Sequence, residues 1–289
     1  SGERVRRALG RAVYPSGALV HRMGLGLPPA RHEVVTLHDV IAWRFPDEGT
    51  PIASAGAELR AARAVVCVSQ ATADDARELF GLDNTRVVYN GVDDAFRTAT
   101  PLDAATRAAL GIPGPYVLHA GGASTRKNLA ALADAWTTSA AGHPELTLAL
   151  SGPAHPRRTE LFRDVPQSVL LGRVDAGIVP GLVAGAEAVV VPSLYEGFGL
   201  PVLEAMAAGT PVVAAATSSI PEVAGDAAVL VQPSPAAIAE GLDAVLVGDV
   251  DGASLVSRGR RRSADFTWER CAAEHAAVWN EFALGSDRA

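Results

Sequence analysis

The chain has 289 residues, 48% of them hydrophobic and 20% charged, which is enough for one large domain or two ordinary ones with sizeable cores. Its formal net charge of −7 argues against a nucleic-acid-binding protein, because such proteins usually carry a basic surface. The two cysteines, Cys67 and Cys271, are too few for a disulfide framework and lack the spacing of metal ligands.

The N-terminal segment and the apolar stretches indicate in which cellular compartment the protein is expected. No apolar stretch approaches the roughly 18 residues that a membrane-spanning helix needs, and no signal peptide is evident. A reducing cytoplasm is therefore expected. Arg4, Arg7 and Arg11 lie on one face of a predicted N-terminal helix. This face is either solvated or contacts the inner face of the membrane or a phosphorylated acceptor.

Short apolar runs, rich in valine and leucine, recur along most of the chain. The runs cover residues 33–38, 64–69, 85–90, 116–122, 146–152, 168–172, 186–193, 210–216 and 227–233. They are continuous rather than alternating, which is typical of strands buried on both faces of a parallel sheet. Helical segments separate most of them, so the predicted fold class is α/β with doubly wound parallel sheets.

Local signals place several boundaries. Thr72 and Asp75 form a pattern similar to a capping box at the start of a helix, and Gly81 is placed to end that helix. The segment 98–115 is rich in alanine, proline and glycine, and we interpret it as the linker into a second domain. The segment 266–283 is predicted to form a long amphipathic helix.

Three parts are therefore predicted: a short Rossmann-like domain over 1–100, a full-sized one over 101–265, and a C-terminal helical part over 266–289. No GxGxxG pattern follows the first strand, and the sequence contains no GxxxxGK[ST] pattern. For this reason a nicotinamide-dependent dehydrogenase and a P-loop NTPase both lose support.

Arg126 and Lys127 lie between the run 116–122 and the predicted helix that follows it. A helix N-terminus carries partial positive charge, so each exposed cation there costs about 0.3–1 kcal/mol. An anion bound between the cations and the helix end would account for that cost. Two solvated surface cations are the plainer alternative.

Glu196 and Glu204 flank a glycine-rich turn. Glu196 directly follows the run 186–193, so we expect it at the ligand crevice outside the carboxyl ends of the strands. Gly197 and Gly199 allow backbone to approach a ligand closely. Glu204 is expected in the first turn of the next helix, where a carboxylate can accept hydrogen bonds from vicinal hydroxyls. The alternative of a loop charge and a helix-dipole acid leaves the glycine turn unexplained. Together with the two cations, these acids indicate a nucleotide-sugar site.

The stretch YEGFGLPVLEAMAAGTPVVA, beginning at residue 195, resembles the signature of a large family of retaining glycosyltransferases. That family, which includes bacterial mannosyl- and glucosyltransferases, carries two glutamates separated by seven residues, as here. The likeness extends to SSIPEVAGDAAVLVQP, GGASTRKNL, VSQATADDARELF, VVYNGVDDAF and TLHD, and runs over residues 33–285. The sequence RKN at 126–128 is similar to one variant of the family.

The resemblance implies a GT-B fold, in which two Rossmann-like domains face each other across a cleft and the final helix crosses back to the first domain. It implies transfer of a sugar from a nucleotide-diphospho-sugar to an acceptor hydroxyl with retention of anomeric configuration. No divalent metal and no further cofactor are expected. The donor would be GDP-, UDP- or dTDP-linked. The acceptor is not identified, and a lipid-linked molecule or a polysaccharide fits the family.

The resemblance also assigns roles to residues. Arg126 and Lys127 would neutralise the diphosphate, Glu196 would contact the donor sugar, and His38 would face the cleft from the first domain. Glu204 would hold the ribose hydroxyls. The other expected donor-binding residues, the last two of them at the base, are Gly121, Gly122, Gly197, Phe198, Gly199, Leu200, Arg173 and Val174.

The chain departs from the family pattern at two places, and two of its histidines need separate interpretation. Many members of the family have Gly-Arg where this chain has Gly121 and Gly122, so Arg126 is expected to be the phosphate arginine. Only 35 residues precede TLHD, where the family usually has further strands and a glycine-rich loop, so the first domain is expected to be incomplete. His38 could instead be a structural strand-end residue, and His119, inside its strand, is interpreted as structural.

Two alternatives to the transferase remain open. A non-catalytic nucleotide-sugar-binding or scaffold module derived from the family is favoured by the short first domain. A GT-B epimerase or phosphorylase would also need a cleft, but the two glutamates do not support it.

Overall fold

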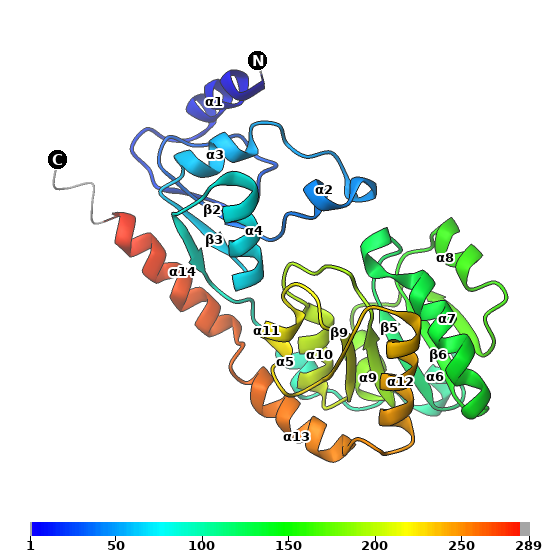
Figure 1. The fold of residues 1–289 in the computed structure, drawn as a ribbon. Coiled ribbons are helices and arrows are strands. Elements are labelled where there is room, and N and C mark those ends of the chain that lie inside the picture. Colours follow the sequence, from blue (N-terminus) through cyan, green and yellow to red (C-terminus); the bar gives the residue numbers. More distant parts are fainter. Residues whose placement is uncertain (1, 284–289) are drawn as a thin grey trace. The chain divides into compact units, whose positions relative to one another are not determined.

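The computed structural model describes residues 2–283 of the chain. The chain forms two compact units (Figure 1). Unit 1 comprises Ser1–Gly91 with Trp268–Ala289, and unit 2 comprises Val92–Thr267. Each unit is built on one parallel sheet, so the α/β class is confirmed.

The sheet of unit 1 has the strand order β1-β2-β3-β4, and all its pairings are parallel. Its strands are β1 (Val20–Arg22), β2 (Glu33–Leu37), β3 (Ala64–Cys67) and β4 (Thr85–Val87). The three predicted strands of this part are confirmed, and β1 is additional. Its sequence, VHR, has no apolar run, which is why the pattern of valines and leucines did not indicate it.

Within residues 2–283, five α-helices and one 3-10 turn complete unit 1. They are α1 (Gly2–Val13), α2 (Ile41–Arg44), η1 (Pro46–Glu48), α3 (Ala55–Ala61), α4 (Gln70–Phe80) and α14 (Trp268–Ala283). Cys271 and Val278 of α14 pack on Val34, Val66 and neighbouring side chains of the sheet. The long helix predicted near the C-terminus therefore forms and covers one face of the sheet of unit 1.

Helix α4 begins earlier than the capping-box pattern predicted. Ser69, not Thr72, is its N-cap, and the Ser69 hydroxyl accepts a hydrogen bond of 3.0 Å from the Thr72 backbone N–H. Asp75 is instead bound by Arg44 of α2. Gly81 ends the helix in the left-handed conformation with φ of 63°, as predicted.

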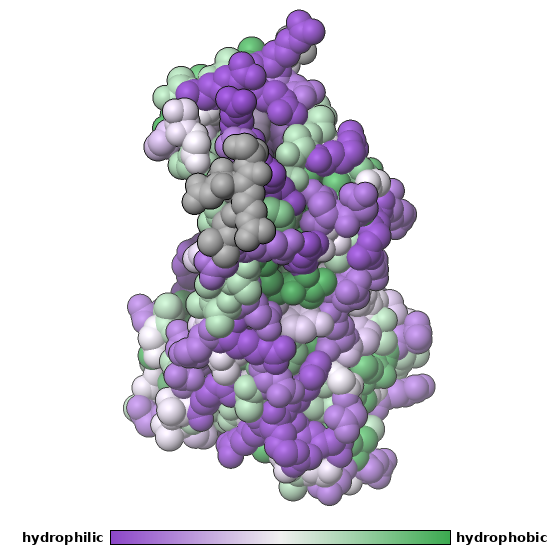
Figure 2. All heavy atoms as spheres, turned by 90° about the vertical axis from the view of Figure 1, so that its left-hand side faces the viewer, coloured by the Kyte–Doolittle hydropathy of each residue, from purple (hydrophilic) through white to green (hydrophobic). Residues whose placement is uncertain are grey.

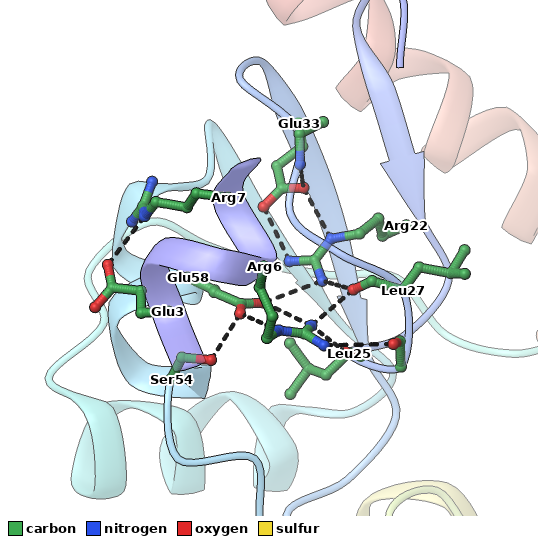
Figure 3. A network of polar contacts seen from close by, with 11 residues as sticks. Glu3, Arg6, Arg7, Arg22, Leu25, Leu27, Glu33, Ser54 and Glu58 are labelled. Carbon is green, nitrogen blue, oxygen red and sulfur yellow. Dashed lines mark hydrogen bonds and ion pairs between the residues drawn. The ribbon is translucent and has the colours of Figure 1, made fainter. Parts of the chain in front are cut away.

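A buried ion-pair network ties α1 and β1 to α3 (Figure 3). Arg22 of β1 donates to Glu33 at 2.8 and 2.9 Å and to Glu58 at 3.1 Å. Glu58 also accepts hydrogen bonds from Arg6 of α1 at 2.6 Å and from Ser54 at 2.8 Å. Burial opposes the charge of Glu58, but these donors outweigh it and hold its pKa below the ordinary value. The network explains how β1 can bury an arginine.

The surface of unit 1 includes an apolar row on α1. Val5, Leu9 and Val13 are exposed and follow each other at four-residue spacing along that helix. Figure 2 shows one face of the whole chain. Most of this face is hydrophilic, and its apolar side chains form small separate patches. No helix within residues 2–283 combines the length and the apolar character that crossing a membrane requires.

Unit 2 contains a six-stranded parallel sheet with the order β10-β9-β8-β5-β6-β7. Its strands are β5 (Tyr116–Ala120), β6 (Thr147–Ser151), β7 (Ser168–Gly172), β8 (Ala188–Val191), β9 (Val212–Ala215) and β10 (Val229–Val231). All six were predicted as apolar runs, and all six are confirmed. The strand order runs outward in opposite directions from the adjacent strands β5 and β8. The loops after these two strands therefore lie at the switch point of the sheet.

Helices cover both faces of this sheet. Those of unit 2 are α5 (Asp94–Arg97), α6 (Ala104–Ala109), α7 (Leu129–Ser139), α8 (Pro156–Leu161), α9 (Val179–Ala184), α10 (Leu200–Ala208), α11 (Ile220–Ala224), α12 (Pro235–Leu246) and α13 (Gly252–Ser263), with 3-10 turns η2 (Thr125–Lys127) and η3 (Ala140–Gly142). Leu132 and Trp136 of α7 share one buried cluster with Ile238 and Leu242 of α12. Helix α10 packs against α9 and α13.

Candidate functional site

A three-residue ion cluster lies at the switch point between β5 and β8. Glu196, in the loop after β8, accepts hydrogen bonds from Arg126 at 2.9 Å on Oε2 and from Lys127 at 2.6 Å on Oε1. Ser193 donates to Oε1 at 2.6 Å. The structure therefore brings together three of the four residues predicted to be catalytic, although they lie some 70 positions apart in the sequence.

The cluster is buried, and its charges depend on one another. The Glu196 side chain is 8% exposed, and those of Lys127 and Arg126 are 9% and 15% exposed. Burial by itself would raise the pKa of Glu196, but the adjacent Lys127 and Arg126 and the Ser193 hydroxyl outweigh it, so this pKa lies below the ordinary value. Glu196 is therefore ionised at neutral pH, and two cations facing one carboxylate leave one positive charge at the site.

The loop that carries the two cations is fixed by its own backbone and by Asn128. Arg126 and Lys127 lie in η2, ahead of α7, and Asn128 follows in the left-handed conformation with φ of 54°. The Asn128 amide donates to the carbonyls of Pro192 and Pro233 at 3.0 Å each. The Leu194 N–H donates to the Arg126 carbonyl at 2.7 Å, so the loops after β5 and β8 are joined directly.

The backbone of Glu196 is held by two serines that the sequence analysis did not assign to the site. The Glu196 N–H donates to the Ser218 hydroxyl at 2.8 Å, and the Ser219 hydroxyl donates to the Glu196 carbonyl at 2.9 Å. Ser218 has a positive φ of 45°. Both residues belong to the SSIPEV stretch that carries the resemblance, but no local pattern indicates what they contact.

Glu204 lies in the second turn of α10, not in the first turn as predicted. The helix begins at Leu200, directly after Gly199, and Glu204 is therefore its fifth residue. Within residues 2–283 the Glu204 side chain makes no hydrogen bond or ion pair, and burial raises its pKa to about 7. A carboxyl group without a partner is available to hydrogen-bond a ligand.

Comparisons with known proteins bear on both units. The family model "Glycosyl transferases group 1" matches residues 114–247, and the model "Glycosyltransferase Family 4" matches residues 14–96. The structure of sucrose-phosphate synthase from Thermosynechococcus elongatus superimposes with a TM-score of 0.70 and 26% identity, covering 86% of this chain and 67% of that one. This chain has the GT-B fold, and glycosyltransferase models match parts of both of its units.

Curated relatives of this chain include mannosyltransferases. It is 42% identical over 102 residues to the O-antigen chain mannosyltransferase B of Escherichia coli, which is 35% of this chain and 27% of that protein. It is 31% identical over 241 residues to a GDP-mannose-dependent alpha-(1-6)-phosphatidylinositol dimannoside mannosyltransferase of Mycobacterium tuberculosis, which is 77% of this chain and 58% of that protein. The chain thus spans less than two thirds of the length of these relatives.

The remaining predicted donor-binding residues lie around the cluster or near the same edge of the sheet. Gly197, Phe198 and Gly199 are buried, and the Phe198 ring packs edge-on against Phe266 at a centroid distance of 5.9 Å. Leu200 is exposed. Gly121 and Gly122 are half-buried at the end of β5, and the exposed Arg173 and half-buried Val174 follow β7.

The two histidines lie in different surroundings. His38 belongs to unit 1, where it is exposed after β2 and its Nε2 lies 2.9 Å from the Met23 carbonyl. His119 is buried in β5, where its Nδ1 donates to the Val190 carbonyl at 3.0 Å. Burial lowers the pKa of His119 to about 4, so the ring is neutral, as expected for a structural histidine.

Side chains that could hold a metal ion are not gathered in the described part of the chain. Within residues 2–283, no three His, Cys, Asp or Glu side chains come together in such a group.

Proposed function

We propose that this chain binds a nucleotide-diphospho-sugar in unit 2 and takes part in transferring the sugar to an acceptor hydroxyl, with retention of configuration and without a metal ion. The observation that carries the proposal is the Arg126–Lys127–Glu196 cluster at the switch point of the sheet. One relative is named as GDP-mannose-dependent, which favours a nucleotide-linked donor. GDP-, UDP- and dTDP-sugars all fit the proposal.

The cluster suits the charge that develops during the reaction. When the sugar leaves, negative charge builds on the β-phosphate of the nucleoside diphosphate. Arg126 and Lys127 are held in place before the donor arrives, because Glu196 binds both of them. Preorganised donors of this kind lower the barrier, and removing one costs about 2.7–4 kcal/mol in known enzymes. We assign the diphosphate to these two cations.

Glu196 has one further acceptor position for the donor sugar. A carboxylate offers about four lone-pair positions. Arg126, Lys127 and Ser193 fill three of them, two on Oε1 and one on Oε2. Within residues 2–283 no donor fills the remaining position on Oε2, which would accept a hydrogen bond from a sugar hydroxyl. Glu196 therefore orients both the cations and the sugar, and no proton transfer is required of it.

The other residues receive roles by resemblance. Glu204, whose carboxyl group has no partner within the described residues, would hold the ribose hydroxyls. Arg173 and Val174 would contact the base, and His38 of unit 1 would orient the reacting sugar. A phosphate oxygen of the leaving group would help to deprotonate the acceptor on the same face, which gives retention.

Turnover of donor by the full chain tests the proposal. The chain is incubated with GDP-mannose, UDP-glucose or dTDP-glucose, and the released nucleoside diphosphate is measured with and without EDTA. We expect activity with one donor, unaffected by EDTA, and a loss of about 100-fold or more in Arg126→Ala and Glu196→Ala. Arg163→Ala, at an exposed position of the same unit, is the control and should keep its rate. Proton NMR of a transfer product reports its anomeric configuration.

Four other outcomes would each contradict one part of the proposed function. Unchanged rates in both site variants would show that the cluster is not the donor site. Calorimetric binding of a donor without any turnover would favour the non-catalytic nucleotide-sugar-binding module. An inverted product would refute retention, and inhibition by EDTA would refute metal independence.

A further inference from the structure

Arg158 is a buried cation of unit 2. It lies in α8 and is 2% exposed. Its guanidinium donates to the carbonyls of Gly121 and Gly122, the second at 2.9 Å, and to the Pro153 carbonyl at 3.3 Å. Within residues 2–283 no carboxylate pairs with it, and its Nε has no hydrogen-bond partner. Keeping an unpaired charge in such a place is unfavourable, because the charge loses its hydration.

The surroundings of Arg158 are shaped to admit it. Gly152, at the end of β6, has φ of 142°, a conformation that favours glycine. A Cβ atom at this position would overlap the Gly121 carbonyl oxygen and lie 2.9 Å from the guanidinium nitrogens of Arg158. Only a glycine at 152 therefore allows the ends of β5 and β6 and the arginine to meet.

The contact with Arg158 also sets the direction of two backbone N–H groups. In a trans peptide unit, the N–H points opposite to the carbonyl. The carbonyls of Gly121 and Gly122 face Arg158, so the N–H groups of Gly122 and Ala123 point away from it. Neither of these N–H groups has a hydrogen-bond partner in the described part of the chain. Successive unpaired N–H groups form a binding place for an anion.

The loop that contains Gly121, Gly122 and Ala123 lies beside the ion cluster of Arg126, Lys127 and Glu196. A Cβ atom built on Gly121 would lie 3.6 Å from the Cε atom of Lys127. The neighbouring Arg157 holds the other end of the loop, since its guanidinium donates to the Thr125 hydroxyl at 2.8 Å. Helix α8 thus supports the segment that runs from Gly121 to the two cations.

We propose that Arg158 is a positioning residue of the donor site, which aims the N–H groups of Gly122 and Ala123 at the diphosphate. The inference rests on the proposed function and names a third cation that contributes to the same site. Arg158 does not touch the donor: it acts through two peptide units, whose dipoles it aligns and polarises. The bound diphosphate would in turn offset the unpaired charge.

Calorimetry with the full chain tests this role. The probes are GDP, UDP and dTDP, each paired with its nucleoside, and the readout is the ratio of diphosphate affinity to nucleoside affinity. Arg158→Met should weaken the best diphosphate by about tenfold or more, because bonds to a charged ligand are strong, and should leave its nucleoside unchanged. Arg158→Lys keeps the charge but not the planar fork, so it should recover part of the loss.

Arg107→Met is the matched control. Arg107 also donates to a glycine carbonyl, that of Gly114 at 3.2 Å, and its Nε is also without a partner. It lies before the first residue of β5, at the opposite end of the strand from Gly121. Arg107→Met should lower the melting temperature of the protein without changing the ratio of diphosphate affinity to nucleoside affinity. If Arg158→Met does not fold, as judged by circular dichroism, Arg158→Lys carries the test with a smaller decrease.

The outcomes distinguish the inference from the proposed function. Wild-type protein that binds none of the three diphosphates contradicts the proposed function, and the inference with it. Wild-type protein that binds one of them, with the same affinity ratio in the folded Arg158 variants, overturns the inference alone. An equal decrease for diphosphate and nucleoside would show a purely structural role, which also overturns it.

Discussion

The two glutamates around the glycine turn have opposite electrostatic surroundings. Glu196 accepts three hydrogen bonds and its pKa is lowered, whereas Glu204 accepts none within residues 2–283 and its pKa is raised to about 7. Their spacing was enough to predict that both acids lie near one strand end. The spacing could not show which acid is paired, because Arg126 and Lys127 come from a loop some 70 positions earlier.

Glu204 makes the stability of the protein depend on pH. Its pKa rises from 4.5 to about 7 on folding, so the folded state binds more protons than the unfolded state between these values. The free energy of unfolding therefore decreases as the pH rises from 4.5 to 7. Glu204→Gln removes this loss, and we expect it to stabilise the protein at pH 8 by about 2 kcal/mol more than at pH 5. Urea denaturation at the two pH values measures the difference.

The control for this prediction is Glu160→Gln. Glu160 is exposed in the same unit, so its substitution should change the free energy of unfolding equally at both pH values. A Glu204→Gln variant that behaves in the same way would show that Glu204 ionises normally in the folded protein.

At the scale of elements, the centres of strands were easier to predict than the ends of helices. Nine apolar runs became nine strands, and those at the centres of the sheets, such as β3, β8 and β9, are buried throughout, which favours continuous valine and leucine. The start of α4 depends on one hydroxyl, that of Ser69, and the start of α10 depends on the backbone of Gly199. Several neighbouring residues could have started each helix. Thr72 was therefore wrongly chosen as the start of α4, and Glu204 was placed one turn too early in α10.

Gly199 tests how far the site depends on its turn. Its φ of 98° is unfavourable for any residue with a Cβ atom, although the space beside it is open, with Ile220 at 3.7 Å. Gly199→Ala should cost about 1–2 kcal/mol of stability and should also weaken nucleotide-sugar binding, because the turn joins Glu196 to α10. Gly248→Ala, with φ of 82° and open space, is the matched control. Thermal melts with and without donor compare the two variants.

The two glycine variants should differ in one respect only. Both should melt at a lower temperature than wild type, but donor should raise the melting temperature of Gly248→Ala as much as that of wild type. An equal ligand shift in Gly199→Ala would mean that the turn does not shape the binding site.

At the scale of the whole molecule, sequence reasoning predicted the two sheets and three charged residues that prove to lie together, but not the polar contacts that hold them. Arg126, Lys127 and Glu196 were predicted from motif and charge, and the structure brings them together. Ser218 and Arg158 were missed because they bind backbone groups of residues distant in the sequence. Strand β1 was missed for a similar reason: its buried Arg22 is tolerated only because acids from elsewhere in unit 1 surround it.

The buried network of Arg6, Arg22, Glu33 and Glu58 gives the strongest stability prediction for unit 1. Glu58 is fully buried and pairs with both Arg6 and Arg22. Glu58→Ala leaves Arg22 buried with one of its two acids missing, so we expect a loss of about 3–5 kcal/mol. Hydrogen exchange of the amides in β1 and β2 measures the effect. Glu78→Ala, which removes an exposed partner of Arg44, should cost less than about 1 kcal/mol.

The pH dependence of this network has the opposite sign to that of Glu204. Because the pKa of Glu58 is lowered on folding, its contribution is complete above the ordinary value of 4.5 and is lost as the pH falls below it. Wild-type unit 1 should therefore lose protection from exchange as the pH falls below 4.5, and Glu58→Gln should lose less over the same interval, because a side-chain amide does not titrate there. Equal losses in the two proteins would place the acid sensitivity in another group.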